Sequence, residues 1–402
     1  MKRKLYFWAK KYINSENMKV AVMLVPIVII LVSQFLKKEF VWTELVDIGI
    51  LVSFMLLAIS EVLVKAIQKN VAKNTEDFAK LTVDYKNLIK KYSCTNLVTY
   101  QGTVFPEQCL CMRVGGEKIV VEDKKDKYYN LPSQIADNSK ELMEAHSAST
   151  IYNQINVRLD DISMENNCII LNTSRTHFFD SLITNRCCDY VFSNRRTTIR
   201  EIYEPGPFIK PLSASKLSNH LGFNGFVITK DGKIPFILRK NQLSIAKSTW
   251  ATSIGASLKT KYALHIENDY LMTTESLGRA IVGEIRDELK ISQDGALTEA
   301  KAVEGIFAFY RDLVEGGKPQ FLFLLQLEDI ESEELRGKIE QNSSSAKNDV
   351  STDGSKVVFY TIDELKTATL EVDKMIIAGY KYAMMPSAVA SIALLLEYIE
   401  KQ

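Results

Sequence analysis

The chain has 402 residues, of which 46% are hydrophobic and 25% are charged, and its formal net charge is +1. This length gives room for two or three domains. The balanced charge argues against a basic protein that binds nucleic-acid polymers. Six cysteines and four histidines are scattered along the chain and fit neither a disulfide framework nor a structural zinc site. We therefore expect reduced and mostly buried thiols.

The first predicted elements form a transmembrane hairpin. Residues 20–36 contain no charged side chain and are long enough for a short membrane-spanning helix, which Pro26 would kink. A second apolar segment, residues 41–64, carries three acidic residues near its ends. A cleaved signal peptide is the alternative, but no small-residue cleavage site follows the first segment. Residues 1–66 are thus predicted to form a two-helix hairpin.

Basic residues predict the orientation of this hairpin. Its loop contains only Lys37 and Lys38, whereas more basic residues flank the two helices on the outside. Because lysine and arginine favour the cytoplasmic side, both termini are predicted to be cytoplasmic. The predicted protein is therefore a multi-pass membrane protein, with the lipid bilayer as a partner. The flanking residues are Lys2, Arg3, Lys4, Lys10, Lys11 and Lys19 before the first helix, and Lys65, Lys69 and Lys73 after the second.

Residues 67–93 continue with a helical pattern and are predicted to be a stalk. Apolar residues recur at three- and four-residue spacing, which gives the helix one apolar stripe. Two alternatives remain for the partner of this stripe. One is a helix of another subunit in a homo-oligomer, and the other is the chain's own folded part.

Residues 94–212 are predicted to be a mixed α/β extension. A helix is expected over residues 139–153, and the segment 204–207, which contains two prolines and a glycine, marks a boundary. Arg195, Arg196 and Arg200 form a basic cluster that is either solvated surface or a phosphate contact. Strands are expected at residues 93–100, 118–122, 155–159, 168–171 and 197–203.

Residues 213–402 are predicted to form the main domain. Residues 222–229 and 234–240 flank an Asp-Gly turn and are expected to pair as a β-hairpin. The apolar segment 375–399 is interrupted by Gly379, Lys381 and Pro386, so a buried closing helix beginning near Pro386 is expected instead of a third membrane span. Further strands are expected at residues 306–310, 320–327 and 357–361, the last running into a helix at 362, with a flexible loop at 341–355.

A helix over residues 277–290 is the element that carries most chemistry. Thr273, Thr274 and Ser276 are candidate N-caps. The side chains of Leu277, Ile281, Ile285 and Leu289 recur every fourth residue and make an apolar stripe. On the same wheel Glu284 and Glu288 face inward and Asp287 lies at the edge of the stripe. Three neighbouring carboxylates on a buried face need a cation, basic partners or raised pKa values.

This helix resembles the Nudix box, G-x5-E-x7-R-E-U-x-E-E-x-G-U, where U is a bulky aliphatic residue. In the stretch 269–291, Glu275, Glu284, Ile285, Glu288 and Ile291 match the box, and Asp287 replaces one glutamate. The substitutions at its other fixed positions are Asp269 and Lys290 for the two glycines and Gly283 for the arginine. The resemblance implies that Glu284, Asp287 and Glu288 are ligands of a Mg²⁺ ion.

The combination of elements resembles one group more closely than the box alone does. A membrane hairpin, a stalk and a diverged Nudix-like domain are similar to the SMODS-associated Nudix-like proteins of bacterial CBASS anti-phage defence. The implied fold class is α+β, with the hairpin and stalk followed by a cytosolic Nudix-like α/β/α sandwich and its mixed N-terminal extension. The implied function is sensing of a cyclic oligonucleotide messenger, which drives oligomerisation and disruption of the inner membrane, so that the infected cell is halted.

The implied ligand site draws on residues from several segments. Arg239, Lys240 and Lys259 are the candidate phosphate contacts, Trp250 or Phe309 the candidate base platform, and Asn219 and His220 candidate hydrogen-bonding groups, with Glu284 and Glu288 facing the ligand. The alternative is a Mg²⁺-dependent Nudix hydrolase of nucleoside diphosphate-X substrates, with Glu288 as its catalytic residue. Loss of the arginine at Gly283 argues against turnover. A membrane scaffold that only binds protein partners is a third reading.

Overall fold

The computed structural model describes residues 85–92, 97–100, 103–144, 146, 153–192, 197–239, 248–258, 260–345 and 354–402. They belong to one compact unit, Ala79–Gln402, and its α+β class is as predicted. The α-helices in the described residues are α4 (Tyr85–Lys91), α5 (Ser133–Ala136), α6 (Ser139–Glu144), α7 (Phe178–Ile183), α8 (Ile199–Tyr203), α9 (Thr260–Ala263), α10 (Thr274–Leu289), α11 (Glu299–Glu304), α12 (Ser332–Ser345), α13 (Ile362–Lys366) and α14 (Pro386–Lys401).

A five-stranded mixed sheet forms the centre of the unit, with the strand order β10-β7-β12-β11-β3. β7 and β12 run parallel, and the other neighbouring strands run antiparallel. Phe223 and Phe321 are register partners on β7 and β12, and their ring centroids lie 5.1 Å apart. The strands are β3 (Leu110–Arg113), β7 (Gly222–Ile228), β10 (Ile254–Ser257), β11 (Ile306–Asp312) and β12 (Lys318–Gln326).

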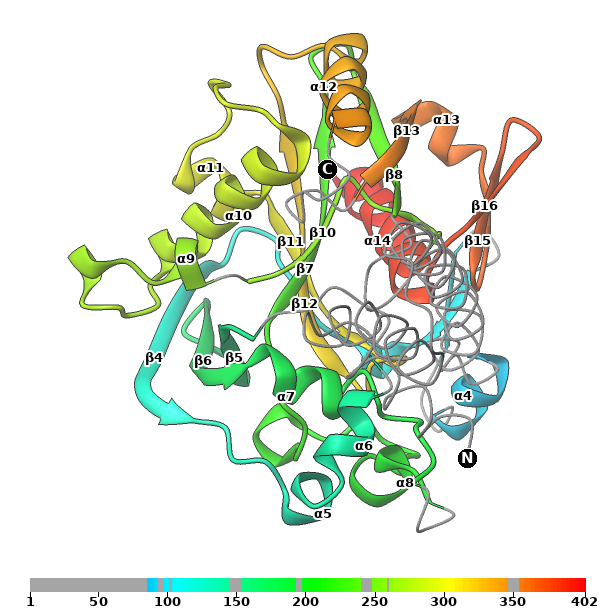
Figure 1. Cartoon of the computed structure of the whole chain (residues 1–402). Coiled ribbons are helices and arrows are strands. Elements are labelled where there is room, and N and C mark those ends of the chain that lie inside the picture. The colour runs from blue at the N-terminus through cyan, green and yellow to red at the C-terminus, as the bar shows by residue number, and fades with distance from the viewer. Residues whose placement is uncertain are drawn as a thin grey trace, which may run out of the picture. The chain divides into compact units, whose positions relative to one another are not determined.

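Side chains alternate between two cores on opposite faces of this sheet. Phe223 and Phe323 belong to the core that contains the buried residues of α10, whereas Phe226 and Leu322 belong to the core that contains those of α14. Figure 1 shows α10 and α14 on the two sides of the sheet. At Gly225 a Cβ atom would lie only 2.0 Å from the ring of Phe323, so this position of β7 accepts only glycine without rearrangement.

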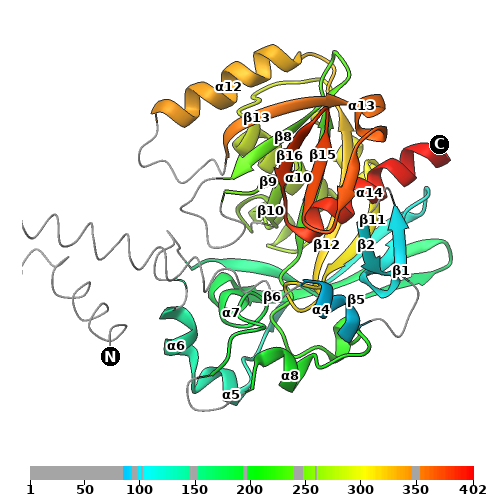
Figure 2. The same cartoon turned by 90° about the vertical axis from the view of Figure 1, so that its right-hand side faces the viewer.

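A second lobe is built on the sheet β4-β6-β5 and helices α5 to α8 (Figure 2). β4 (Lys118–Tyr128) runs parallel to β6 (Cys168–His177), and β5 (Ile155–Glu165) runs antiparallel to it. Asp123 of β4 accepts two hydrogen bonds from the Arg175 guanidinium of β6, at 2.7 and 2.6 Å. The same carboxylate accepts a 2.9 Å hydrogen bond from the Met272 backbone, just before α10. This buried ion pair therefore joins the second lobe to the start of α10.

Smaller sheets complete the unit. A three-stranded sheet has the order β13-β8-β9, another has the order β14-β15-β16, and β1 pairs with β2. Trp250 of β9 is the register partner of Leu238 on β8. The strands are β1 (Leu97–Tyr100), β2 (Thr103–Pro106), β8 (Lys233–Arg239), β9 (Trp250–Ala251), β13 (Gly354–Thr361), β14 (Thr369–Glu371), β15 (Lys374–Ile377) and β16 (Tyr380–Ala383).

The predicted transmembrane hairpin needs correction. In the part of the chain that the structure describes, no helix combines the length and the apolar character that crossing a bilayer requires. The predicted spans at residues 20–36 and 41–64 lie outside the described residues. The structure thus supports the α+β fold class, and it does not support the predicted membrane hairpin or the predicted multi-pass location in the inner membrane.

Two local predictions are wrong for reasons that the structure makes clear. Residues 199–203 form helix α8, not a strand, because Thr198 and Glu201 make a capping box that stabilises the first helical turn. The segments 222–228 and 233–239 do make a turn, in which the Thr229 backbone donates to Lys233, but they do not pair as a hairpin. β7 joins the central sheet beside β12, whereas β8 pairs with β13 and β9.

The described end of the predicted stalk packs on the chain's own folded unit. Leu88 and Ile89 of α4 and the following Tyr92 are buried, and they belong to the same core as α14. For this segment the structure favours the second of the two partners considered above. The remainder of the stalk, up to residue 84, lies outside the described residues.

Candidate ligand-binding site

The acidic side chains of α10 differ in their surroundings. Glu284 is fully buried, at 0% exposure, whereas Glu288 and Asp287 are half-buried. Asp287 accepts a 2.6 Å hydrogen bond from Lys261 of α9. Within the described ranges no group of three or more His, Cys, Asp or Glu is arranged to hold a metal ion. With Asp287 paired to Lys261 and Glu284 enclosed, the described residues do not fit a Mg²⁺ site.

Helix α9 covers the position at which the Nudix box has an arginine. A Cβ atom built on Gly283 would lie 2.6 Å from the nearest ring atom of Tyr262. The Lys261 ammonium group lies 4.3 Å from the centre of that ring. Gly283 thus allows Tyr262 to pack directly on α10, and the Lys261–Asp287 ion pair closes the same face.

This close approach gives a matched pair of substitutions. Gly283→Ala is expected to lower the free energy of unfolding by about 1–3 kcal/mol, because the added methyl group overlaps the Tyr262 ring. Gly337→Ala in α12, where a Cβ meets nothing within 4 Å, is expected to raise it by about 0.5–1 kcal/mol. Denaturant unfolding measures both values. In a Tyr262→Ala background the cost of Gly283→Ala should disappear; equal effects of the two glycine substitutions would contradict the packing argument.

Three of the predicted ligand residues do come together, on the α14 face of the central sheet. Residues 219–221 run between β5 and β10: the Leu221 backbone donates to Val157, and the Leu258 backbone donates to Leu221. We define the buried polar cluster as Arg186, Asn219, His220, Arg239, Glu315 and Lys318.

Ion pairs and hydrogen bonds connect the members of the buried polar cluster. The Lys318 ammonium group lies 3.1 Å from the Glu315 carboxylate, and Arg186 lies 3.9 Å from it. The ring Nε2 of His220 is 3.0 Å from the hydroxyl of Ser257, and Arg239 donates to the Gly255 carbonyl at 3.3 Å. Lys318 and Arg186 thus flank the Glu315 carboxylate, and the charge of Arg239 also helps to lower the pKa of Glu315, against the opposing effect of burial.

Burial and these charges shift the ionisation of the cluster. Burial, followed by the positive charges of Lys318 and Arg186, lowers the pKa of His220 well below its usual 6.5, so the ring is neutral at neutral pH. Burial also lowers the pKa of Lys318, against the opposing effect of Glu315. Burial and the negative charge of Glu315 raise the pKa of Asp312, which lies at the end of β11. Cations therefore outnumber anions in the cluster whether or not Asp312 is ionised.

Several polar atoms in and beside the cluster have no hydrogen-bond partner among the residues that the structure describes. They are Nδ1 of His220, Nδ2 of Asn219 and both amide atoms of Asn156, and all three residues are fully buried. Asn156 and Arg158 are two residues apart on β5, so their side chains point to the same face of this strand, and the Arg158 backbone forms an isolated β-bridge with His220. Leaving buried polar atoms without partners costs about 1–3 kcal/mol each. Their convergence favours a site that a polar ligand completes.

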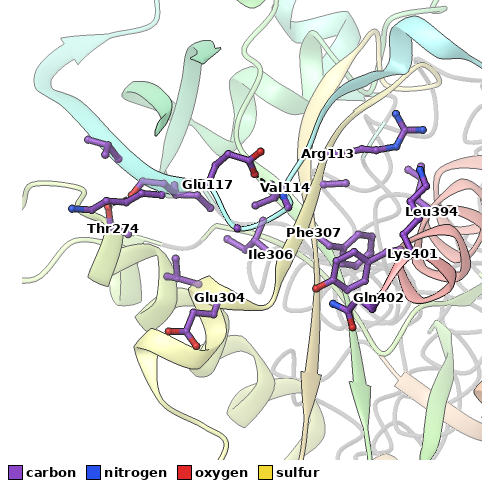
Figure 3. Close-up of a pocket in the computed structure, with 18 of the residues that line it drawn as sticks. Arg113, Val114, Glu117, Thr274, Glu304, Ile306, Phe307, Leu394, Lys401 and Gln402 are labelled. Carbon is purple, nitrogen blue, oxygen red and sulfur yellow. Dashed lines mark hydrogen bonds between the residues drawn. The ribbon is translucent and has the colours of Figure 1, made fainter. Parts of the chain in front are cut away.

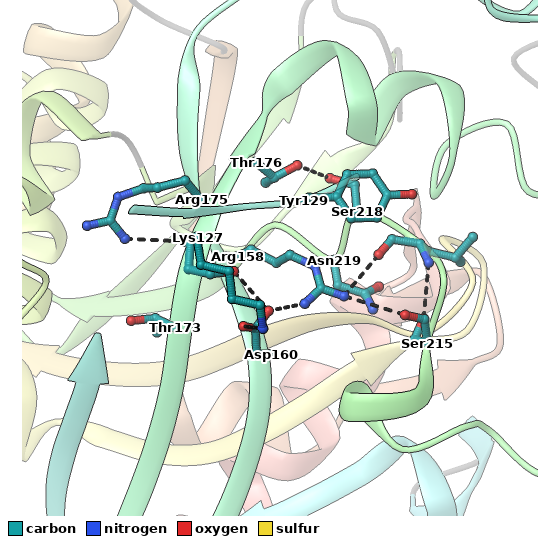
Figure 4. A network of polar contacts seen from close by, with 12 residues as sticks. Lys127, Tyr129, Arg158, Asp160, Thr173, Arg175, Thr176, Ser215, Ser218 and Asn219 are labelled. Atoms are coloured by element: carbon teal, nitrogen blue, oxygen red, sulfur yellow. Dashed lines mark hydrogen bonds and ion pairs between the residues drawn. The ribbon is translucent and has the colours of Figure 1, made fainter. Parts of the chain in front are cut away.

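A network of hydrogen bonds and ion pairs lies beside the cluster and holds it in place (Figure 4). Arg158 forms an ion pair with Asp160, which also accepts a 2.9 Å hydrogen bond from Ser174. Ser218 Oγ lies 2.8 Å from Thr176 Oγ1. These contacts fix the segment that carries Asn219 and His220 against the second lobe.

An aromatic side chain lies beside the cluster. Phe178, the first residue of α7, is half-buried, and its ring centre lies 6.2 Å from that of His220. The Arg186 guanidinium lies 5.3 Å from the centre of the Phe178 ring. The site thus combines cations, neutral hydrogen-bonding groups and one aromatic face.

The other predicted ligand residues lie elsewhere. Trp250 packs edge-on against Tyr382 at 5.1 Å, and Phe309 lies in the core at 6.4 Å from Phe321, so neither ring contributes to the buried polar cluster. Lys240 and Lys259 are outside the described residues, as are Arg195 and Arg196. Arg200 is buried in a bidentate ion pair with Asp189, at 2.7 and 2.8 Å, and is not solvated surface.

A large cavity lies apart from the cluster, between the start of β4 and the end of α14 (Figure 3). Its volume is about 1040 Å³, and Phe307 and Tyr398 in its wall stack at 5.0 Å. Four glutamates outnumber its three cations, so the cavity does not favour an anionic ligand. Its charged lining residues are Arg113, Glu117, Lys118, Glu275, Glu304, Glu397 and Lys401.

Comparison with known proteins adds no relative. No protein-family model matches the chain, and no curated protein matches it. The function is therefore inferred from the residues of the site.

Proposed function

We propose that this protein is a receptor for a nucleotide messenger of the cyclic-oligonucleotide type, and that the buried polar cluster binds the ligand. The observation that carries the proposal is the convergence of an excess of cations with buried polar atoms that lack partners. A nucleotide complements both features. Its anionic phosphates can pair with the cations, and its base edges can donate to and accept from the buried polar atoms.

Each member of the cluster has a part in this proposal. The Arg186 and Arg239 guanidinium groups can bind phosphate oxygens with two parallel hydrogen bonds, and Lys318 supplies a compact charge. His220 is engaged at Nε2 by Ser257, so in either tautomer Nδ1 is the atom that faces the ligand. The Asn219 amide adds a donor. A base can stack on Phe178.

The hydrolase alternative has weaker support. It needs the acids of α10 to act together on a metal-bound pyrophosphate, but Asp287 pairs with Lys261 and Glu284 is enclosed. Tyr262 lies on Gly283, where the box has its arginine. The membrane disruption that the resemblance implied required the hairpin and is not part of the proposal.

A ligand panel tests the proposed function. Full-length protein is mixed with cyclic di- and trinucleotides built from the four common ribonucleosides, and its melting temperature and oligomer size are followed. At a concentration of 100 times Kd, a ligand stabilises the folded state by about 2.7 kcal/mol, which is a readily measured shift. We expect at least one cyclic nucleotide to raise the melting temperature, without added Mg²⁺. No shift with any member would overturn the receptor proposal; Mg²⁺-dependent hydrolysis of a dinucleoside polyphosphate, lost in Glu288→Gln, would favour the enzyme.

A further inference from the structure

The turn between β11 and β12 connects the buried polar cluster with helix α4. We propose that this turn, residues 312–318, couples ligand binding at the cluster to the conformation of α4. The ligand thereby regulates the segment that leads toward the N-terminus of the chain. The proposal deepens the proposed function and depends on it for the identity of the ligand.

The first step of the connection is inside the turn. Glu315 and Lys318, two members of the cluster, are its residues, and both are buried. The turn is closed by hydrogen bonds from the Gly317 backbone to the Asp312 carbonyl, at 2.7 Å, and from the Val314 backbone to the Asp312 carboxylate, at 2.9 Å. Asn185 donates to the Glu315 carbonyl at 2.9 Å and to Asn219 at 3.0 Å. A change in the ion pairing of Lys318 or Glu315 therefore shifts the backbone of the whole turn.

The second step leads from the turn to α8. Arg200 of α8 donates a 3.0 Å hydrogen bond to the Val314 carbonyl, in the middle of the turn. Its guanidinium is buried and is held in a fixed orientation by Asp189. Because a guanidinium is planar and rigid, a shift of the Val314 carbonyl requires Arg200 to move or to lose this bond.

The third step reaches the end of α4. Arg200 Nη1 lies 3.3 Å from the Tyr92 hydroxyl, and its guanidinium lies 5.9 Å from the centre of the Tyr92 ring. Tyr92 follows α4 directly, and its hydroxyl donates to the Glu204 carbonyl. Gly206 lets the same loop approach α4, since a Cβ there would lie 2.7 Å from the Lys91 carbonyl. A continuous chain of buried contacts thus joins Lys318 to α4 and gives the proposed coupling between the two sites a physical route.

The coupling is tested with a double-mutant cycle that needs no ligand. Lys318→Met removes the partner of Glu315, and hydrogen exchange of the amides of residues 85–92 is compared with that of wild type in the full-length chain. We expect exchange in this segment to change by about fivefold or more. Arg200→Lys keeps a positive charge beside Asp189 but loses the planar guanidinium group. In this background the effect of Lys318→Met on hydrogen exchange should fall below about twofold. Tyr92→Phe, which removes only the hydroxyl, should reduce it as well.

Controls separate coupling from a general loss of stability. Lys301→Met removes an exposed lysine that pairs with Glu328 and should leave exchange of residues 85–92 unchanged. The amides of α10 report overall unfolding, and a change there equal to that in α4 would overturn the proposal. So would an effect of Lys318→Met that is the same with and without the Arg200 substitution. Absence of nucleotide binding in the panel would overturn the proposed function and leave this cycle interpretable.

Discussion

Replacing Asp123 by alanine is expected to lower the free energy of unfolding by about 3–5 kcal/mol, the range for breaking a buried ion pair by removing one partner. The side chains of Asp123 and Arg175 are each only 2% exposed. Without the carboxylate, the Arg175 guanidinium keeps a 3.0 Å hydrogen bond to the Tyr270 carbonyl but loses its counter-charge. The Met272 amide also loses its hydrogen-bond acceptor. Both the start of α10 and the contact between the two lobes are therefore destabilised.

The pH dependence identifies the carboxylate as the cause. Burial alone would raise the pKa of Asp123, but hydrogen bonds from Arg175, Met272 and Thr173 outweigh it and lower the pKa below its usual 3.8. A lowered pKa in the folded state means that the stabilisation is complete above the usual value and is lost as the pH falls through the folded one. The stability difference between wild type and Asp123→Asn should therefore be constant above about pH 5 and shrink below about pH 4.

Asp126→Ala is the matched control, because Asp126 is an exposed aspartate on the same strand. Surface substitutions of this kind change stability by about 0.5 kcal/mol or less. Denaturant unfolding of the three variants gives both the magnitude and its pH dependence. An Asp123→Ala variant as stable as Asp126→Ala would contradict the assignment of this ion pair as the joint between the lobes.

The second large effect is expected on nucleotide binding. Lys318→Met should weaken the binding of the cyclic nucleotide that shifts the melting temperature by about 30-fold or more, because removing one buried charged partner costs about 2 kcal/mol at least. Titration calorimetry of full-length protein, well below its melting temperature, measures the change. Lys301→Met, which alters an exposed pair, is expected to change the affinity less than twofold.

Arg239→Met provides a variant of the site that is easier to fold. Arg239 is half-buried, so its replacement disturbs the core less than that of Lys318. The affinity should still fall, by about tenfold for the loss of a charge-assisted hydrogen bond. If both cluster variants bound the nucleotide as tightly as wild type, the ligand would have to be held elsewhere, and the cluster would be only a structural feature.

Local signals in the sequence were sufficient for the elements that end the chain and for α10. Thr273 caps α10, its side chain accepting a hydrogen bond from the Ser276 backbone at 3.1 Å, and Pro386 begins α14. The wheel that placed Glu284 on the inward side was correct, since this residue is fully buried. These features depend on residues within one or two helical turns, which is why spacing alone predicts them.

The site itself could be predicted only in part. Asn219, His220 and Arg239 were among the candidates, but Arg186, Glu315 and Lys318 were not. They come from a turn and a strand end that carry no motif, and Asn185 and Glu315, which are hydrogen-bonded, are 130 residues apart in the chain. For α8 a usable signal was present: the capping box of Thr198 and Glu201 outweighs the β-branched residues that suggested a strand.

The most direct test of the central claim is a crystal structure of the full-length protein with the cyclic nucleotide that gives the largest melting shift. The proposed function predicts a phosphate oxygen about 3 Å from the Lys318 ammonium group and a ligand atom hydrogen-bonded to Nδ1 of His220. A nucleotide bound with Mg²⁺ against Glu284 and Glu288 of α10, with the buried polar cluster unchanged, would contradict it.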